Sequence, residues 1–149
     1  GTIRDNIAST GYIKNLLVGP IISFSKEKQY VEKQIADLNL KCASQYHAVN
    51  TLSGGNKQKV VFGKWIGGDA DILILDCPTR GIDIGVKASM YQLIYQMKKE
   101  GRSIILISEE LPELIGMSDR ILIMKDGQVT HEARRTEQPT EHDLINYMI

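Results

Sequence analysis

The sequence has little cysteine, because only Cys42 and Cys77 occur among its 149 residues, far apart and with no CxxC pair. Structural zinc sites and secreted disulfide frameworks need clustered cysteines, so both are disfavoured. An excess of positive charge is also absent, since 18 Lys and Arg balance 18 Asp and Glu. Nucleic-acid binders normally carry a basic excess, and the sequence therefore predicts no nucleic-acid partner.

Long apolar runs are missing as well. The longest, such as residues 72–75 and 104–107, are far shorter than the ~20 residues that a membrane-spanning helix needs. The three histidines stand alone, which disfavours a metal centre or a catalytic base. What is present is a globular composition, 42% hydrophobic and 24% charged, in a chain long enough for one domain or part of a larger one.

The pattern of the chain changes near residue 50. Before this point it is helical: Thr2 followed by Asp5 indicates a helix start, and Ser25 precedes a helix predicted over 26–38. After it, helices and strands alternate, which predicts an α/β fold with a mainly parallel sheet and ligands at the carboxyl ends of the strands.

The second part of the chain divides into short predicted elements. Trp65 is expected in the core, and Tyr91 and Tyr95 on a half-buried helix face. The patterns predict helices over 56–66, 86–100 and 140–148, a helical turn over 112–116, strands over 71–76, 103–107 and 121–124, and an antiparallel return over 128–131 after the Asp126–Gly127 turn.

Three segments carry residues suited to phosphate chemistry. Two glycines, Gly54 and Gly55, let backbone amides approach an anion, and Ser53 adds a hydroxyl before a helix whose N-terminus is positive. Asp76 ends an apolar strand, where a carboxylate can hold the water shell of Mg²⁺. Asp83 ends a tight turn. Taken alone, each segment is common in proteins: the first as a glycine turn before a helix, the second as a strand followed by a capping residue, and the third as a loop.

In this order and spacing, the three segments resemble the nucleotide-binding domain of ABC transporters. Leu52–Gln58 matches the signature motif of that family, Ile72–Asp76 its Walker B strand, and Gly81–Asp83 its D-loop. Residues 118–127 match the strand and turn that end such domains. The likeness covers essentially the whole chain, most strongly residues 51–127.

The resemblance implies a partial P-loop NTPase core. Residues 51–149 would form its C-terminal half, and residues 1–50 most of the helical subdomain. Asn56 and Lys57 follow the glycines. Together with the sequence of residues 108–119, they resemble the corresponding residues in the second ATPase domain of bacterial double-domain monosaccharide importers.

The resemblance also implies a function, which is to couple ATP binding and hydrolysis to sugar uptake, with ATP and Mg as cofactors. The expected partners are a second ATPase domain bound head to tail, membrane permease subunits and, indirectly, a periplasmic sugar-binding protein. The expected location is peripheral, at the cytoplasmic face of the inner membrane. Asp76 would hold Mg²⁺ through water. The residues expected to face a nucleotide held by the partner domain, or to lie at the contact with it, are Ser53, Gly54, Gly55, Gln58 and Asp83.

The sequence departs from the family pattern in three ways. No GxxxxGK[ST] loop occurs, so the cradle for the α and β phosphates is missing and the chain alone is expected to be inactive. Cys77 stands at the usual Glu position, and an ordinary thiol is mostly neutral at pH 7 and a poor replacement for a carboxylate. Glu109 stands at the usual His position, where an anion repels phosphate. The domain's own ATP site is therefore expected to hydrolyse slowly or not at all.

Two alternatives remain open from the sequence. A non-transport ABC ATPase would share these motifs but usually carries extra linkers or coiled-coil insertions, which are absent here. A nucleotide-free interaction module would account for the missing phosphate loop. A phosphate loop encoded upstream of Gly1 would discriminate in favour of an ATPase.

Overall fold

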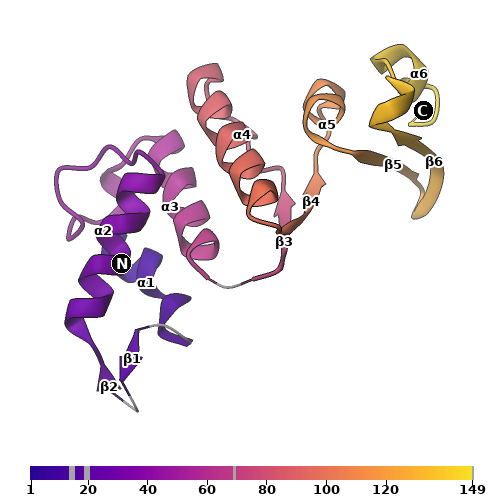
Figure 1. Ribbon diagram of the computed structural model, residues 1–149. Helices are drawn as coiled ribbons and strands as arrows, with labels where there is room; N and C mark the ends of the chain where they lie inside the picture. Colours follow the sequence, from indigo (N-terminus) through magenta and orange to yellow (C-terminus); the bar gives the residue numbers. More distant parts are fainter. Residues whose placement is uncertain (14–15, 19–20, 69, 149) are drawn as a thin grey trace. The chain divides into compact units, whose positions relative to one another are not determined.

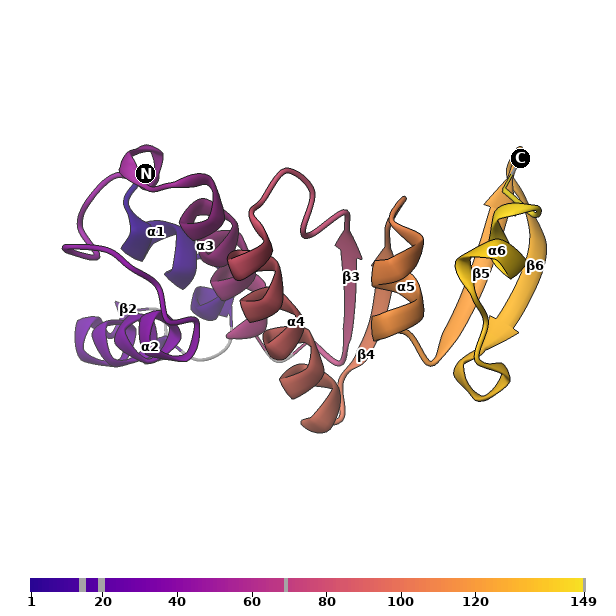
Figure 2. The same cartoon turned by 90° about the horizontal axis from the view of Figure 1, so that it is seen from above.

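The computed structural model describes residues 1–13, 16–18, 21–68 and 70–148. They form two compact units. The first comprises Gly1–Ile72 and Thr79–Ser103, and the second Leu73–Pro78 and Ile104–Ile149. Figures 1 and 2 show helices and short paired strands alternating along the second part of the chain, so the predicted α/β fold is confirmed.

The first unit is mainly helical and begins with α1 (Ile3–Ala8). The backbone N–H of Asp5 donates to the Thr2 hydroxyl, and the Asp5 carboxylate accepts from the N–H of Thr2, which is the reciprocal capping that the sequence predicted. The other elements are η1 (Gly11–Ile13), β1 (Leu17–Val18), β2 (Ile21–Ile22), α2 (Phe24–Asp37), η2 (Val49–Thr51), α3 (Gly54–Ile66) and α4 (Ile84–Lys99). Strands β1 and β2 pair antiparallel.

The helices of this unit share an apolar core. Burial of aliphatic side chains supplies the main driving force for packing such amphipathic helices together. The fully buried aliphatic residues come from all four helices and include Ile3, Ile7, Val31, Val60 and Met90.

A charged cluster is buried beside this core. Glu27 is only 2% exposed, and both of its oxygens accept hydrogen bonds from the Arg4 guanidinium, each at 2.8 Å. The Tyr12 hydroxyl donates to the same carboxylate, also at 2.8 Å. Burial alone would raise the pKa of Glu27, but the bonds from Arg4 and Tyr12 outweigh it and hold this pKa below its ordinary value. Burial, and then the bond to Glu27, raise the pKa of Tyr12 to about 12.

The second unit contains most of the strand residues. Its elements, with β3 and β4 each beginning in the first unit, are β3 (Ile72–Asp76), β4 (Ser103–Ile107), α5 (Leu111–Met117), β5 (Arg120–Lys125), β6 (Gln128–Arg134), η3 (Arg135–Glu137) and α6 (Glu141–Ile145). The core of the unit lies between the hairpin and the two helices, and is formed by Leu111, Ile121, Ile123, Ala133 and Leu144.

Strands β3 and β4 pair with each other in one sheet. The N–H of Ser103 donates to the carbonyl of Asp71 at one end of the pair, and the N–H of Cys77 donates to the carbonyl of Ile107 at the other. Because bonded residues advance together along both strands, the strands run parallel, and their carboxyl ends lie at one edge.

Strands β5 and β6 form an antiparallel hairpin, as the Asp126–Gly127 turn predicted. Both turn residues have positive φ, 50° and 77°, as tight hairpin turns require. The ring of His131, on β6, stacks on that of Tyr147 at 3.9 Å between centroids. The Thr130 hydroxyl donates to the Tyr147 carbonyl at 2.9 Å, so β6 holds the end of the chain.

Several element boundaries differ from the sequence expectation. Helix α2 begins at Phe24, because Ser23 rather than Ser25 accepts from the Lys26 N–H as its cap. Helix α4 begins at Ile84, since Asp83 caps it. Helix α6 ends at Ile145 rather than Met148, and the following residues are held by β6 instead.

The expectation that Trp65 lies in the core is wrong, because the side chain is 52% exposed. The Lys64 ammonium covers its ring at 5.1 Å, so the indole is part of a cation–π pair on the helix surface. Tyr95 is likewise exposed rather than half-buried, with the Lys99 ammonium 5.2 Å from its ring.

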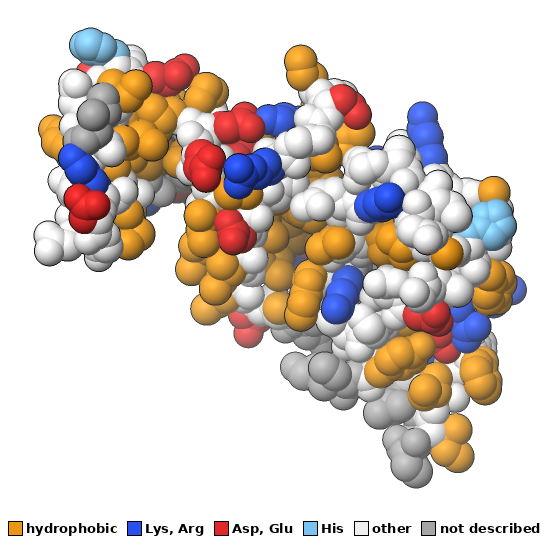
Figure 3. Space-filling view, turned by 180° about the vertical axis from the view of Figure 1, so that it is seen from behind, with side chains coloured by type: hydrophobic (Ala, Val, Ile, Leu, Met, Phe, Trp, Pro, Cys, Tyr) orange, Lys and Arg blue, Asp and Glu red, His pale blue; other side chains and the backbone are white. Residues whose placement is uncertain are grey.

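Large apolar side chains are also exposed on the strands of the second unit. Ile74 of β3 is 66% exposed, and Ile105 of β4 is 51% exposed. They are joined by Ile107 and, on the hairpin, by Met124. Figure 3 shows that apolar side chains reach the surface over both units. Exposed apolar groups of this size on a strand pair are typical of surfaces that another element covers.

Candidate functional site

The predicted signature residues lie at the start of α3. Ser53 is the N-cap, and its hydroxyl accepts from the backbone N–H of Asn56 at 3.5 Å and from the Asn56 side-chain amide at 3.0 Å. Ser53 and Gly54 are exposed, whereas Gly55 is buried. A Cβ added to Gly54 would meet no atom within 4 Å. The first turn of α3 therefore presents the backbone of Gly54 to solvent, whereas Gly55 is covered.

Gln58 lies one turn further along α3 and is half-buried. The same helix carries two residues that sequence reasoning did not single out for contacts. Asn56 accepts the N–H of Lys41 at 3.1 Å, and Lys59 is buried with its ammonium donating to the Asn39 carbonyl at 3.1 Å. Burial, and then the nearby charge of Lys41, lower the pKa of Lys59. These bonds attach α3 to the segment before it.

The predicted D-loop turn, Gly81–Asp83, leads directly into α4. Gly81 has φ 71°, a conformation that glycine adopts without strain. Asp83 is exposed and caps the helix, accepting the N–H of Val86 at 3.0 Å. Val86 lies against Gly55, since a Cβ at Gly55 would be 2.7 Å from Cγ2 of Val86. The first unit thus brings the signature segment and Asp83 together at the starts of two adjacent helices, which Figures 1 and 2 show side by side.

Asp76 and Cys77 lie at the carboxyl end of β3 in the second unit. Asp76 is exposed and Cys77 is half-buried. Cys77 has φ 44°, a left-handed conformation that is uncommon for a residue other than glycine. Its N–H still bonds the Ile107 carbonyl at 2.9 Å, so the turn begins directly at the end of the strand pair.

Glu109 follows β4 at the same end of the parallel pair. It is exposed, and the residue after it donates its backbone N–H to the Ser108 hydroxyl at 3.0 Å. The second unit therefore gathers Asp76, Cys77 and Glu109 at one edge. In the part of the chain that the structure describes, no group of three or more His, Cys, Asp or Glu could hold a metal ion by itself. Among the described residues, no helix has both the length and the apolar character needed to cross a membrane.

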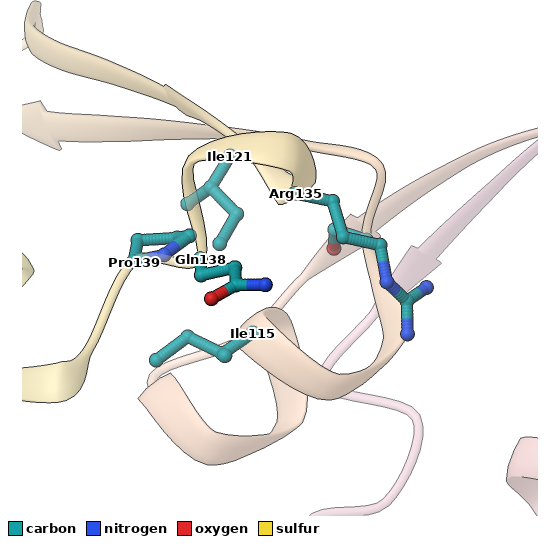
Figure 4. Close-up of a pocket in the computed structure, with 6 residues that line it drawn as sticks. Ile115, Ile121, Arg135, Gln138 and Pro139 are labelled. Carbon is teal, nitrogen blue, oxygen red and sulfur yellow. The ribbon is translucent and has the colours of Figure 1, made fainter.

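A pocket in the second unit contains none of the predicted site residues. It encloses about 320 Å³ between α5, β5 and η3 (Figure 4). Its lining is Ile115, Ser118, Ile121, Arg135, Gln138 and Pro139. The Arg135 guanidinium donates to the Gly116 carbonyl at 3.2 Å, so it braces α5 against η3.

Comparisons with known proteins give matching results from sequence and from fold, although no family model matches the chain. The arabinose import ATP-binding protein AraG of Vibrio parahaemolyticus is 45% identical over 136 residues, which are 91% of this chain and 27% of that protein. The ribose import ATP-binding protein RbsA of Bacillus cereus is 43% identical over 86% of this chain and 26% of its own length. The chain thus spans about a quarter of the length of these relatives.

A solved dimeric structure of an ATP-binding cassette in a post-hydrolysis state, bound to ADP and Pi, superposes with a TM-score of 0.78. The match covers 90% of this chain and 56% of the cassette at 21% identity, and it shows the shared fold. The predicted resemblance is therefore confirmed: the chain has the fold of part of an ATP-binding cassette, and its sequence is similar to arabinose and ribose import ATP-binding proteins.

Proposed function

We propose that the chain is part of the ATP-binding subunit of a bacterial ABC transporter that imports a monosaccharide. The observation that carries this proposal is the pairing of the exposed signature segment with the Asp83 turn in one unit. The similarity to arabinose and ribose import ATP-binding proteins supports transport rather than a non-transport ABC ATPase or a nucleotide-free module.

The start of α3 fits the terminal phosphate of a nucleotide. The amide groups in the first turn of a helix have no acceptor within that helix, and the helix dipole favours an anion there. Gly54 leaves open space over its backbone, and Ser53 adds a hydroxyl. Bound ATP would supply a γ-phosphate for transfer to water. Ser53, Gly54 and Gly55 donate hydrogen bonds to this γ-phosphate. They approach it from the side opposite the partner domain that holds the nucleotide.

This arrangement requires a second ATPase domain, bound head to tail. Asp83 lies at the contact between the two domains, and Gln58 lies on the α3 surface behind the signature segment. The helical subdomain, residues 1–50, contacts the cytoplasmic loops of the permease, around residues 15–50. A periplasmic sugar-binding protein acts through that permease. The assembly is peripheral, at the cytoplasmic face of the inner membrane.

The chain's own nucleotide site is impaired in hydrolysis. Asp76 is exposed at the end of β3, and a carboxylate there fits Mg²⁺ held through water. Cys77 occupies the position from which a carboxylate polarises the attacking water, and a thiol is a weak general base at neutral pH. Glu109 places a negative charge where a hydrogen-bond donor would serve the γ-phosphate. Both substitutions reduce hydrolysis at the chain's own site. Neither prevents the start of α3 from binding a nucleotide that the partner domain holds.

The first test is a titration of the purified chain with MgATP, followed by Trp65 fluorescence and by phosphate release. Trp65 is the only tryptophan, and it lies on α3, the helix that begins at the predicted signature residues. We expect weak or undetectable binding and no turnover, because the phosphate loop is missing. Tight, saturable binding with turnover would contradict this account.

The second arm adds an ATPase domain that carries a phosphate loop and is catalytically slow by itself. We expect the chain to stimulate phosphate release, and Ser53→Ala to reduce this stimulation by about 10-fold or more. Ser25→Ala, at an exposed serine of α2, is the matched control and should stimulate like the native chain. Equal stimulation by both variants would reject the role of Ser53.

A further inference from the structure

Val86 occupies the space that a side chain at Gly55 would need. A Cβ at Gly55 would lie 2.7 Å from Cγ2 and 2.9 Å from Cγ1 of Val86. Real Cβ atoms essentially never approach other atoms so closely. Both methyl groups of Val86 therefore rest on the backbone of Gly55, and α3 and α4 approach each other here because residue 55 lacks a side chain.

The position of Val86 depends in turn on Asp83. The Asp83 carboxylate accepts the Val86 N–H at 3.0 Å, which fixes the first turn of α4. A valine in a helix has one strongly preferred side-chain rotamer, so a fixed backbone also fixes its two methyl groups. The three residues form a continuous path from the Asp83 carboxylate, through Val86, to the backbone of Gly55.

We propose that Val86 is a positioning residue, which transmits the state of the Asp83 turn to the amide groups of the signature segment. Close-packed side chains transmit displacement because they leave no free volume to absorb it. When the bond from Val86 to Asp83 is lost, the first turn of α4 loosens and the support of Gly54 and Gly55 changes. The functional meaning of this link rests on the proposed function, because it would report engagement of the partner domain at Asp83 to the phosphate-binding amides.

The link is measured on this chain without nucleotide, from the amide proton and nitrogen chemical shifts of Gly54 and Gly55. We expect Asp83→Ala to move both signals in the native background. In a Val86→Ala background, the same change should move them several-fold less, because the methyl groups that connect the helices are gone. Thr140→Ala removes a comparable helix cap from α6 and serves as the control that leaves both signals in place.

A second measurement uses steric rescue. Gly55→Ala should lower the melting temperature by several degrees, because its Cβ meets the two methyl groups of Val86. Combining it with Val86→Ala should recover part of this loss, since the methyl groups are absent. Val86→Thr retains the branched shape and should transmit the Asp83→Ala shift as the native residue does.

Equal shifts of the glycine signals in the native and Val86→Ala backgrounds would overturn the proposal, as would additive melting losses in the double variant. Both measurements are made without ATP. If the link is found but Ser53→Ala leaves stimulation unchanged, the proposed function fails and the link stands. If the link is not found but Ser53→Ala reduces the stimulation, the link is rejected and the proposed function stands.

Discussion

Among single residues, Glu27 depends closely on its donors. A carboxylate that is almost fully buried is costly unless it is paired, and Arg4 and Tyr12 provide three hydrogen bonds to it. Helices α1 and α2 are joined by this pair. The negative charge of Glu27 therefore stabilises the packing of α1 and α2 in the first unit.

Removing this charge should destabilise the chain. Glu27→Gln leaves the Arg4 guanidinium without its anionic partner, and we expect a loss of about 2–4 kcal/mol in the free energy of unfolding, measured with urea. Because the pKa of folded Glu27 lies below its ordinary value of 4.5, its contribution is present above that pH. It is lost as the pH falls through the folded pKa.

The variant should accordingly lose the part of the acid sensitivity that lies below about pH 4.5. Glu32→Gln is the matched control on the same helix. Its carboxylate is 53% exposed and pairs with Lys28 at 3.9 Å, so we expect less than about 0.5 kcal/mol. A loss of similar size in both variants would show that the burial of Glu27 carries no special weight.

The residue scale also shows what sequence can and cannot predict. Thr2 and Asp5 form the capping pair that their spacing indicates, because that geometry is local. The burial of Lys59 and the positive φ of Cys77 have no local signal, since one depends on the carbonyl of Asn39 and the other on β4. The chemical roles of Asp76, Cys77 and Glu109 stay predictions.

At the scale of elements, the hairpin and the helices follow from short patterns. Strand β4 spans the predicted residues 103–107, and β5 extends the predicted strand by one residue at each end. Boundaries fail where two candidate caps compete, as Ser23 and Ser25 do before α2. They fail also where tertiary contacts take over, as at the end of α6, where β6 binds the chain.

Two glycines in the second unit should respond oppositely to substitution by alanine. Gly127 has φ 77° in the hairpin turn, so Gly127→Ala forces a strained backbone and should cost about 1–2 kcal/mol. Gly116 lies in α5 with open space around its Cβ position, so Gly116→Ala should stabilise by about 0.5–1 kcal/mol. Thermal unfolding followed by circular dichroism measures both, and shifts of the same sign would contradict the assigned backbone conformations.

At the scale of the whole molecule, the exposed apolar strand surface has a consequence for behaviour in solution. Ile74 and Ile105 are both more than half exposed in the second unit, and unpaired strand edges add to the tendency of such surfaces to associate. The parallel pairing and the α/β class were predictable from the order of the motifs. The exposure of these strands depends on tertiary packing, which no local pattern contains.

We expect the isolated chain to self-associate as its concentration rises, with sedimentation velocity as the measurement. Ile74→Glu or Ile105→Glu should reduce the association, because a charge on this surface opposes its burial. Ile84→Glu is the control, at a residue that is 86% exposed but belongs to the first unit. If only Ile84→Glu reduced the association, the associating surface would lie at the start of α4 instead.

The scarcity of cysteine has a practical consequence when it is combined with the division into units. Cys42 lies in the first unit and Cys77 in the second, and both are half-buried. The native chain thus carries one labelling position in each unit, without any engineered residue. Spin labels attached to the two sulfur atoms would give the distance distribution between the units by pulsed electron resonance, alone and with a partner domain. The same sulfur at position 77 that weakens the proposed chemistry makes the separation of the two units directly measurable.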